Sequence, residues 1–435
     1  MNEETKNRIA AINSGIIPEG YKKTKVGIVP VEWEVTKLSE YLYVNKEKNT
    51  ELKYSKNDVF SISGEYGIVN QIDFLGRSFA GVSVEPYRVV YPENIVYTKS
   101  PLKVNPYGII KSNQRKDTGI VSTLYAVYHC KENVLSKYIE YYFGLDVTLN
   151  NYLLPLVNIG SKHDMKISDE NVLKGLVVFP PLPEQQKIVE ILSVQDKLIE
   201  LQEKKIEQLK ELKKAYLQKM FPKKGSKYPE LRFKGFTAPW EQRKLGEISE
   251  SFEYGLNAAA TEYDGKHKYI RITDIDDSTH LFIQDNLTSP DIDFSTADDY
   301  LLQEGDVLFA RTGASVGKTY IYRSSDGDLY FAGFLIRAKI KSDYDADFVF
   351  QNTLTDNYDS YIRITSQRSG QPGVNAQEYA NFALSVPCLA EQKKIGAYFS
   401  NLDNLITLHQ RKSEQEKQKK KALMQLLLTG KVRCI

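Results

Sequence analysis

Two stretches of this sequence combine Lys and Arg with Asn and Gln and contain no acidic residue, a composition that suits contact with a nucleic acid. They span residues 97–116 and 361–375, and residues 158–166 occupy the place of the second stretch in the first half of the chain. Lys and Arg neutralise phosphates, Arg can bind guanine through two hydrogen bonds, and Asn or Gln can bind adenine in the same way. Solvated loops have the same composition, so both interpretations stay open here. The candidate DNA-contacting residues are Lys99, Lys111, Asn113, Arg115, Lys116, Lys162, His163, Lys166, Arg311, Lys318, Arg363, Gln367, Arg368 and Gln371.

The segment Thr312–Thr319 resembles a phosphate-binding loop of the form G-x-x-x-x-G-K-[ST]. Its first residue is Thr where the motif requires Gly, and the sequence that follows does not predict a helix. We therefore predict a tight turn between two strands, with Arg311 and Lys318 available to face a DNA backbone, and no nucleotide hydrolysis.

Other catalytic motifs are incomplete. Asn105–Gly108 lacks one proline of an amino-methyltransferase signature, and no Gly-rich loop for the methyl donor accompanies it. Pro290 and Asp291 are not followed by the acid-x-Lys triplet of a nuclease before Lys341. The five histidines lack metal-ligand spacing, and three widely separated cysteines argue against a disulfide framework. These patterns predict neither a catalytic nor a metal site in this chain.

An internal repeat must position the polar stretches, because the same residues recur at one fixed offset. Pro180–Ile188 recurs as Pro387–Ile395, 207 positions later (391 − 184), and Trp33 recurs as Trp240 at the same offset. Two separate anchors with one offset indicate that a whole unit of roughly 190 residues is duplicated. The chain is therefore expected to contain two related globules, each beginning at a core tryptophan.

Between its tryptophan and its long helix, each copy contains short runs of β-branched and aromatic residues bounded by Gly, Pro, Asn and Ser. Short helices are expected near 136–143 and 344–355. Each copy is thus predicted to be a mixed α+β globule around a twisted sheet. The predicted strands are 59–62, 95–98 and 124–128 in the first copy, and 269–272, 307–310, 318–322 and 334–338 in the second.

Each copy ends in a long helix with an apolar stripe at three- and four-residue spacings. The first helix runs from Glu184 to near Phe221, about 55 Å at 1.5 Å per residue. The second has a polar middle and a basic run at 411–421, which a solvated helix face would explain. Antiparallel pairing of the two helices would bury both stripes and place the globules at opposite ends. The residues assigned to this spacer and to partner docking are Glu184, Gln185, Ile188, Leu192, Ile199, Ile206, Glu391, Gln392, Ile395, Phe399 and Ile406.

Length and charge set broad limits on the chain. Its 58 Lys and Arg residues nearly balance 56 Asp and Glu residues, so any basic surface must be local. No apolar run approaches the roughly 18 residues of a membrane span, and the N-terminus lacks an apolar signal region, so a cytoplasmic protein is expected. The predicted segments are a first globule at 1–180, a first long helix at 181–222, a second globule at 223–387, and a second helix with a basic tail at 388–435.

The doubled Glu-Gln helix start, the closing Leu428–Arg433 and the strand-turn Gly305–Gly313 resemble the DNA-specificity (S) subunit of type I restriction-modification systems. The resemblance covers essentially the whole chain. It implies two α+β target recognition domains, each of which reads one half of a bipartite, interrupted DNA site. It also implies two long antiparallel spacer helices, a pseudo-two-fold repeat, and docking of two methyltransferase (M) subunits. Pro181–Pro183 is replaced by Cys388–Ala390 in the second copy, a departure from the pattern.

The resemblance further implies a non-catalytic subunit. Restriction (R) subunits would complete the complex, and S-adenosylmethionine and ATP would bind the partner subunits. Two other classes stay open, namely a coiled-coil interaction scaffold and a self-sufficient methyltransferase. A DNA binder would lose affinity steeply with log salt, which separates it from the scaffold. The two half-sites do not follow from the sequence, because base choice depends on loop geometry.

Overall fold

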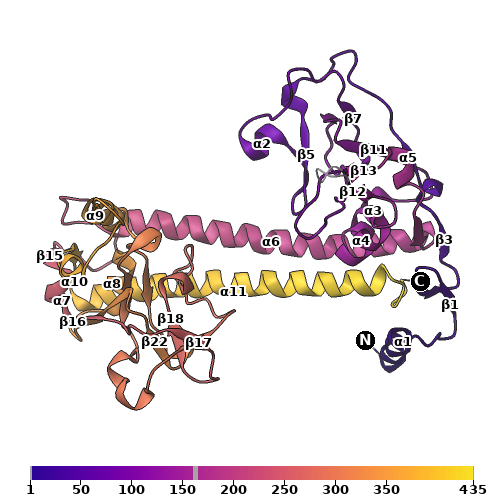
Figure 1. Ribbon diagram of the computed structural model, residues 1–435. Helices are drawn as coiled ribbons and strands as arrows, with labels where there is room; N and C mark the ends of the chain where they lie inside the picture. The colour runs from indigo at the N-terminus through magenta and orange to yellow at the C-terminus, as the bar shows by residue number, and fades with distance from the viewer. Residues whose placement is uncertain (1, 160–164, 435) are drawn as a thin grey trace. The chain divides into compact units, whose positions relative to one another are not determined.

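The computed structural model describes residues 2–159 and 165–434, and the chain divides into two compact units. Unit 1 comprises residues 1–201 and 413–435, and unit 2 comprises residues 202–412. Two helices of 39 residues, α6 (Leu182–Met220) and α11 (Leu389–Leu427), each contribute to both units (Figure 1). None of the helices in the described part of the chain is long and apolar enough to cross a membrane.

A four-stranded antiparallel sheet forms the centre of unit 1, in the order β4-β11-β8-β9. Its strands are rich in β-branched and aromatic residues, which pack well on a pleated surface. Tyr97 and Tyr128 of this sheet are buried in one core with Trp33. Helix α3 packs against β9. The elements named here are β4 (Leu42–Val44), β8 (Ile95–Thr98), β9 (Ile110–Ser112), β11 (Tyr125–Cys130) and α3 (Ser136–Phe143).

The other described strands of unit 1 form two-stranded pairs. Helix α1 begins after Asn2, whose side chain accepts a hydrogen bond from Thr5 N, as a helix N-cap requires. These elements are α1 (Glu3–Asn13), β1 (Tyr21–Thr24) with β2 (Gly27–Pro30), β3 (Glu34–Lys37) with β14 (Leu176–Phe179), β5 (Phe60–Ser63) with β6 (Gly67–Asn70), α2 (Gln71–Leu75), β7 (Arg88–Val90) with β10 (Gly119–Val121), α4 (Asp146–Leu153), β12 (Asn158–Ile159) with β13 (Met165–Lys166), and α5 (Asp169–Val172).

Unit 2 repeats this plan with its own four-stranded antiparallel sheet, in the order β16-β23-β20-β21. Trp240 is buried in its core with Phe309 and Phe348. The sheet strands are β16 (Ser249–Tyr254), β20 (Val307–Ala310), β21 (Thr319–Ile321) and β23 (Leu335–Ile340). The other strands and α-helices are β15 (Glu241–Lys244) with β24 (Ala383–Val386), α7 (Leu245–Ile248), β17 (Ala260–Glu262) with β19 (Thr288–Pro290), β18 (Lys268–Ile270) with β22 (Leu329–Phe331), α8 (Ala346–Asn352), α9 (Asp356–Thr365) and α10 (Ala376–Ala380).

The two sheets correspond strand by strand, which confirms the predicted repeat of an α+β globule. Each sheet is followed by two short helices, α3 and α4 in unit 1 and α8 and α9 in unit 2. Strands occur at 60–63 and 268–270, close to the predicted 59–62 and 269–272, and neither belongs to a central sheet. Residues 60–63 form a hairpin with β6, and residues 268–270 pair in parallel with β22. Periodicity identifies a strand but not its partner, because pairing depends on contacts distant in sequence.

Within each unit, α6 and α11 pack together as an antiparallel pair. In unit 1, Ile188 shares the core with Met424, and in unit 2 Leu209 packs with Leu402. Residue numbers therefore rise along α6 as they fall along α11. Proline is tolerated in the first turn of a helix, so Pro183 does not prevent α6 from starting at Leu182.

The polar middle of α11 faces α6. Ser413 is buried, and Glu416 accepts a hydrogen bond from Gln195 in unit 1. In unit 2, His409 Nδ1 lies 2.7 Å from Gln202 Oε1. Gln202 and His409 are equivalent positions of the repeat, 207 residues apart (409 − 202). At this point of the antiparallel pair, equivalent positions of the two helices therefore face each other. The expected solvated face is therefore restricted to the outer side of α11.

Candidate nucleic-acid interface

The Glu-Gln pair at the start of α6 is buried and attaches the helix to unit 1. Glu184 accepts hydrogen bonds from Trp33 Nε1 at 3.0 Å and from Arg433 Nε at 2.8 Å. Gln185 accepts one from Leu135 N at 3.1 Å. Burial favours a higher pKa for Glu184, but these bonds outweigh it and lower the pKa, so the carboxylate stays charged.

The start of α11 makes the equivalent attachment in unit 2. Glu391 accepts hydrogen bonds from Arg232 at 2.7 and 2.8 Å, and Gln392 accepts one from Asp345 N at 3.1 Å. Trp240 Nε1 has no hydrogen-bond partner within the described residues. The arginine comes from the segment after α6, whereas unit 1 uses an arginine from the end of the chain. The same charge pair is thus built from different segments.

The remaining residues assigned to the spacer and to docking also face inward. Ile206 is half-buried, and the others are buried. Their contacts lie within the chain, so they build the helix pair. Apolar side chains that the docking prediction did not include are exposed instead, and Leu198 and Leu201 recur as Leu405 and Leu408 at the offset of 207. The buried set is Ile188, Leu192, Ile199, Ile395, Phe399 and Ile406.

A repeated aspartate attaches the short helices of each unit to its long helices. In unit 2, Asp403 accepts a hydrogen bond from Lys213 Nζ at 2.7 Å, and in unit 1 Asp196 pairs with Lys420. Each aspartate also accepts a bond from the short helix α8 or α3. Both the acids and the lysines are related by 207 positions, so the ion pair is conserved between the repeats. Lys420, which belongs to the predicted basic run at 411–421, thus forms one of these ion pairs.

Three adjacent strands of the unit 2 sheet, β16, β20 and β23, have ends that lie side by side, and we call this row of strand ends the edge. Arg311 directly follows β20, Phe334 directly precedes β23, and Tyr254 is the last residue of β16. The Arg311 guanidinium carbon lies 5.0 Å from the centre of the Tyr254 ring and 5.9 Å from that of Phe334. Both rings are exposed. This edge therefore presents an arginine held by two aromatic rings, a favourable cation–π arrangement.

The loop 366–375 lies against the same edge. Val374 N donates to Arg311 O at 2.9 Å, and Thr312 forms a β-bridge with Gly373. The second polar stretch of the sequence is thus joined to the end of β20, as a shared binding surface requires.

Arg368 holds this loop in place. Its Nη2 atom donates to both carboxylate oxygens of Glu378, at 2.6 and 2.7 Å, and its Nη1 atom donates to two backbone carbonyls. Gln367, Gln371 and Arg363 are exposed. Two glutamines therefore remain available to base edges, while Arg368 makes intramolecular contacts.

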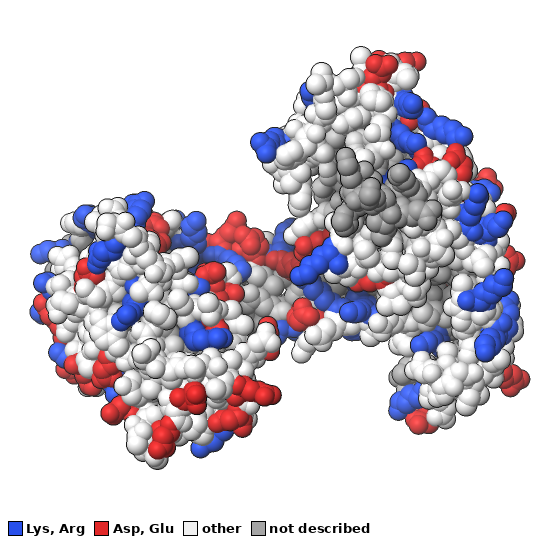
Figure 2. All heavy atoms as spheres, in the orientation of Figure 1, with Lys and Arg blue, Asp and Glu red and all other residues white. Residues whose placement is uncertain are grey.

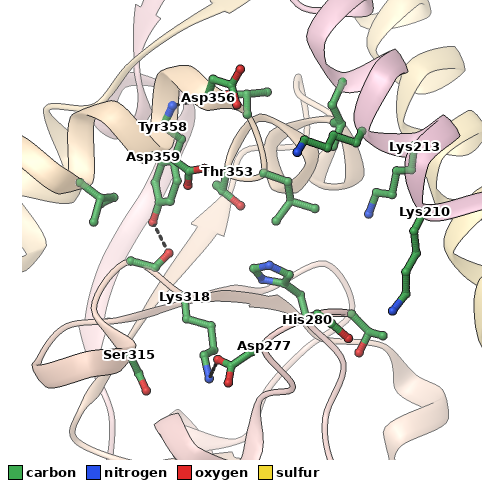
Figure 3. A pocket seen from close by; sticks show the side chains of 18 of the residues that line it. Lys210, Lys213, Asp277, His280, Ser315, Lys318, Thr353, Asp356, Tyr358 and Asp359 are labelled. Atoms are coloured by element: carbon green, nitrogen blue, oxygen red, sulfur yellow. Dashed lines mark hydrogen bonds and ion pairs between the residues drawn. The ribbon is translucent and has the colours of Figure 1, made fainter. Parts of the chain in front are cut away.

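Lys318 and Arg363 line a cavity of about 600 Å³ within unit 2 (Figure 3). Lys318 Nζ lies 2.5 Å from Asp277 Oδ1, and Lys210 and Lys213 enter the cavity from α6. Positive and negative groups are mixed around the wall, which does not favour a simple anion. Across the described residues, no cluster of three or more His, Cys, Asp or Glu side chains could hold a metal ion.

His280 forms part of the cavity wall with an unusual backbone. Its φ of 57° is left-handed, and its Nδ1 atom lies 2.9 Å from Thr319 O. Because a carbonyl only accepts hydrogen bonds, Nδ1 carries the proton. Burial lowers the pKa of His280, although the bond to Thr319 opposes the shift, so the ring is neutral at neutral pH.

The segment Thr312–Thr319 connects two strands, as predicted. A short 3-10 turn covers Gly313–Ser315, and Gly317 N donates back to Ala310 O at 2.9 Å before β21 begins. A phosphate-binding loop would lead into the N-terminus of a helix, whose N–H groups bind the phosphates. The turn lacks that arrangement.

Lys99 occupies the corresponding strand end in unit 1, directly after β8. Its Nζ lies 2.8 Å from Asp169 Oδ1, and Arg88 pairs with the same carboxylate. Asp169 is buried. Lys99, the first of the candidate DNA-contacting residues, therefore pairs with a buried carboxylate inside unit 1.

The neighbouring candidates of unit 1 also make internal contacts. Asn113 is fully buried and donates to a backbone carbonyl at 3.0 Å. Arg115 lies 2.9 Å from Asp117. Burial lowers the pKa of Lys111, and the charge of Glu140 opposes this shift. Asn113 and Arg115 therefore stabilise the conformation of this stretch.

Lys116 is exposed. Lys166 belongs to β13, and Lys162 and His163 lie outside the described residues. On the face shown in Figure 2, Lys and Arg side chains are interspersed with Asp and Glu, so no single basic area dominates it. Sequence reasoning missed Tyr254 and Phe334. Phe334 is the first residue of the predicted strand 334–338, which was a usable signal, whereas no strand was predicted at 249–254.

Comparison with known proteins gives a match to one family model along most of the chain. The model describes a "Type I restriction modification DNA specificity domain" and matches twice, at residues 30–211 and 238–418. The two matches begin about one repeat apart, in agreement with the duplicated fold.

Two curated relatives from Methanocaldococcus jannaschii match over nearly their full length. The type I restriction enzyme MjaVIII specificity subunit is 25% identical, and the match covers 95% of this chain and 96% of the relative. The putative type I restriction enzyme MjaX specificity subunit is 24% identical, with 95% and 97% covered.

Solved structures share the fold. The S subunit of a type I restriction-modification system from M. genitalium has a TM-score of 0.55 at 15% identity, with 93% of this chain and 96% of that chain covered. A chain from a study of type I complex assembly has a TM-score of 0.51 at 15% identity, with 93% and 99% covered.

Proposed function

Because the chain belongs to the family of type I restriction-modification DNA specificity domains, which it matches twice, we propose that its two units read the two halves of an interrupted DNA site. The chain is the DNA-recognition subunit of such a system. The observation that carries the division into half-sites is the repeated sheet with unlike edges. One scaffold occurs twice, but the side chains at corresponding strand ends differ.

The helix pair is proposed to set the spacing between the half-sites. DNA rotates as it advances, so two readers recognise two short sequences only at a fixed separation along the duplex. The inward-facing residues of α6 and α11 support this role, because they make the pair a packed spacer rather than two independent helices. The alternative of a scaffold without DNA binding is not favoured.

Two M subunits are proposed to dock on the outer faces of α6 and α11. Leu198, Leu201, Leu405 and Leu408 are exposed apolar residues at repeated positions, and exposed apolar groups on a helix are typical of a protein interface. A repeated face would offer each M subunit the same contacts. R subunits would join this complex.

The chain itself is proposed to be non-catalytic, and S-adenosylmethionine and ATP are assigned to the partner subunits. The incomplete methyltransferase signature and the strand-to-strand turn at 312–319 support this assignment. Because this subunit must reach DNA together with its partner subunits, we also propose a cytoplasmic location.

The proposal is tested by mapping methylated adenines in host DNA with and without the gene for this chain. We expect one bipartite motif with a constant spacer to lose methylation when the gene is removed. The purified full chain should bind a duplex that carries this motif, and its affinity should fall steeply with log salt. An unchanged methylation map together with salt-independent binding would contradict the proposal, and methyl transfer by the chain alone would contradict its non-catalytic part.

A further inference from the structure

We propose that Arg311 is a DNA-contacting residue of unit 2, whereas Lys99, at the corresponding position of unit 1, is not. This inference rests on the proposed DNA-reading function and names one residue responsible for it. The equivalence of the two positions comes from backbone geometry. Arg311 N donates to Phe334 O at 3.0 Å, and Lys99 N donates to Leu124 O at 3.2 Å.

The sheet registers agree with this equivalence. Ala310 pairs with Leu335 in unit 2, and Thr98 pairs with Tyr125 in unit 1. In each sheet these are the last paired residues before the edge. The next residue along the chain is the basic residue, so both cations leave the sheet at the same place.

Unit 1 neutralises its cation internally. The side chain of Lys99 is only 19% exposed, and its ion pair with Asp169 is joined by Arg88 on the same carboxylate. Asp169 is the first residue of α5, directly after the N-cap Ser168. A buried carboxylate needs these cations, because an unpaired buried charge is costly.

Among the residues that the structure describes, unit 2 has no carboxylate paired with the corresponding cation, Arg311. The first residue of the corresponding helix α10, directly after the N-cap Asn375, is Ala376. Within the described residues, Arg311 forms no ion pair and is held by two rings, Tyr254 and Phe334. These rings are 43% and 57% exposed. At this strand end, the basic residue is neutralised by an ion pair in unit 1 and is held by two exposed aromatic rings in unit 2.

An arginine held between aromatic rings suits a partner with two adjacent acceptors. The guanidinium is planar, carries five N–H donors, and is always charged, so rings that fix its plane also fix the direction of its donors. DNA supplies two such acceptor pairs, the O6 and N7 atoms of guanine and the oxygens of a phosphate. Gln371 of the adjoining loop is exposed beside this edge. The shared chemistry is a bidentate acceptor on DNA.

The test measures binding of the full chain to a duplex that carries the mapped site. Arg311→Met keeps the aliphatic contact with the rings but removes the donors, and we expect a loss of affinity of roughly fivefold to a hundredfold. Lys224→Ala, an exposed cation on unit 2 without an ion pair within the described residues, is the charge control and should change affinity by less than about twofold. Lys99→Met should leave the affinity of the folded protein unchanged but lower its unfolding temperature.

Arg311→Lys separates the two sources of acceptors. If Arg311 contacts a phosphate, Arg311→Lys should retain most of the affinity, and Arg311→Met should lower the log–log salt slope by about 1 for every DNA sequence. If Arg311 contacts a guanine, Arg311→Lys should lose as much affinity as Arg311→Met. That loss should disappear when one guanine of one half-site is replaced. Wild-type affinity in Arg311→Met, or an equal loss in folded Lys99→Met, would overturn the inference. A wild-type chain that binds no DNA would instead contradict the proposed function.

Discussion

At the scale of single residues, a side chain suited to DNA contact can be required by the fold itself. Arg368 has the chemistry to bind guanine, yet its guanidinium bonds Glu378 and two backbone carbonyls. Glu378 in turn closes a capping box with Asn375 at the start of α10. The loop that carries Gln367 and Gln371 is therefore held by a charged pair, and its shape depends on both partners.

The role of Arg368 can be decided by changing each partner. We expect Arg368→Ala to weaken DNA binding by about 1–3 kcal/mol at one half-site only, because the loop of unit 2 loses its support. Glu378→Gln leaves Arg368 in place but removes the charge that holds it, so a similar loss is expected in a competition assay with altered half-sites. If Arg368 itself reads a base, Glu378→Gln should bind as well as wild type or better.

His280 gives unit 2 a dependence on pH. Its pKa is lowered by burial, and Lys213 and Lys318 lower it further, while Thr319 and Asp403 oppose the shift. A histidine whose folded pKa is below the ordinary value of about 6.5 supports the fold fully above that pH. This support declines as the pH falls from there through the folded pKa, because the unfolded chain then binds more protons.

We expect His280→Asn to reduce the loss of stability between pH 8 and pH 5. Asparagine accepts a left-handed backbone better than most residues, so the φ of 57° is retained at low cost. Thermal unfolding of both proteins at several pH values measures the difference. Identical pH profiles would show that the pKa of His280 is the same in the folded and the unfolded protein.

At the scale of elements, the long helices are fixed to the sheets by repeated polar contacts as well as apolar packing. Asp403 bonds Lys213 of α6 and Gln351 of α8, which links three helices. Asp196 bonds Tyr141 of α3 in unit 1. The acid is retained in both repeats while its uncharged partner changes from Gln to Tyr. Two unlike globules can thus use one kind of attachment.

Asp403→Asn should lower the free energy of unfolding by about 1–2 kcal/mol, because a hydrogen bond to a charged group is lost and the site is partly exposed. Urea denaturation monitored by far-UV circular dichroism measures the change in the free energy of unfolding. Asp403→Ala should cost more, since the bond from Gln351 is lost as well. An equal midpoint for wild type and both variants would show that the contact does not contribute to stability.

At the scale of the whole molecule, the duplication gives two sheets with equivalent strand orders but different side chains at corresponding strand ends. Unit 2 presents an arginine held by aromatic rings where unit 1 closes an ion pair, and the sequence segments 366–375 and 158–166 differ. Such a chain suits an asymmetric DNA site. The helix pair is proposed to keep the two half-sites at one spacing.

Removing four residues between Gln202 and Leu209, with the four that face them between Leu402 and His409, should move one reader by about one helical turn, roughly 6 Å. We expect the preferred spacer between the half-sites to change while both half-site sequences stay the same. Methylation mapping in a host that expresses the shortened chain measures both quantities. A control deletion in the segment 223–226, outside both helices, should leave the spacer unchanged, and altered half-sites would contradict the spacer proposal.

The sequence by itself determined the duplication, the two long helices and the α+β class. These follow from local periodicity and from identical residues at one offset, both of which are properties of the chain order. The helix at 136–143 and the strands at 95–98 and 307–310 agree with the structure residue for residue. Strand pairing was beyond the sequence, because pairs such as β3 with β14 join residues far apart in the chain.

The tertiary structure alone decided which candidate side chains are available. Lys99 and Arg311 have similar chemistry and similar places in the repeat, and the sequence ranked them together. What separates them is the residue that the fold brings opposite each one, Asp169 for Lys99 and two exposed rings for Arg311. A charge that meets an opposite charge is neutralised inside the protein, and only the folded chain determines whether that meeting occurs.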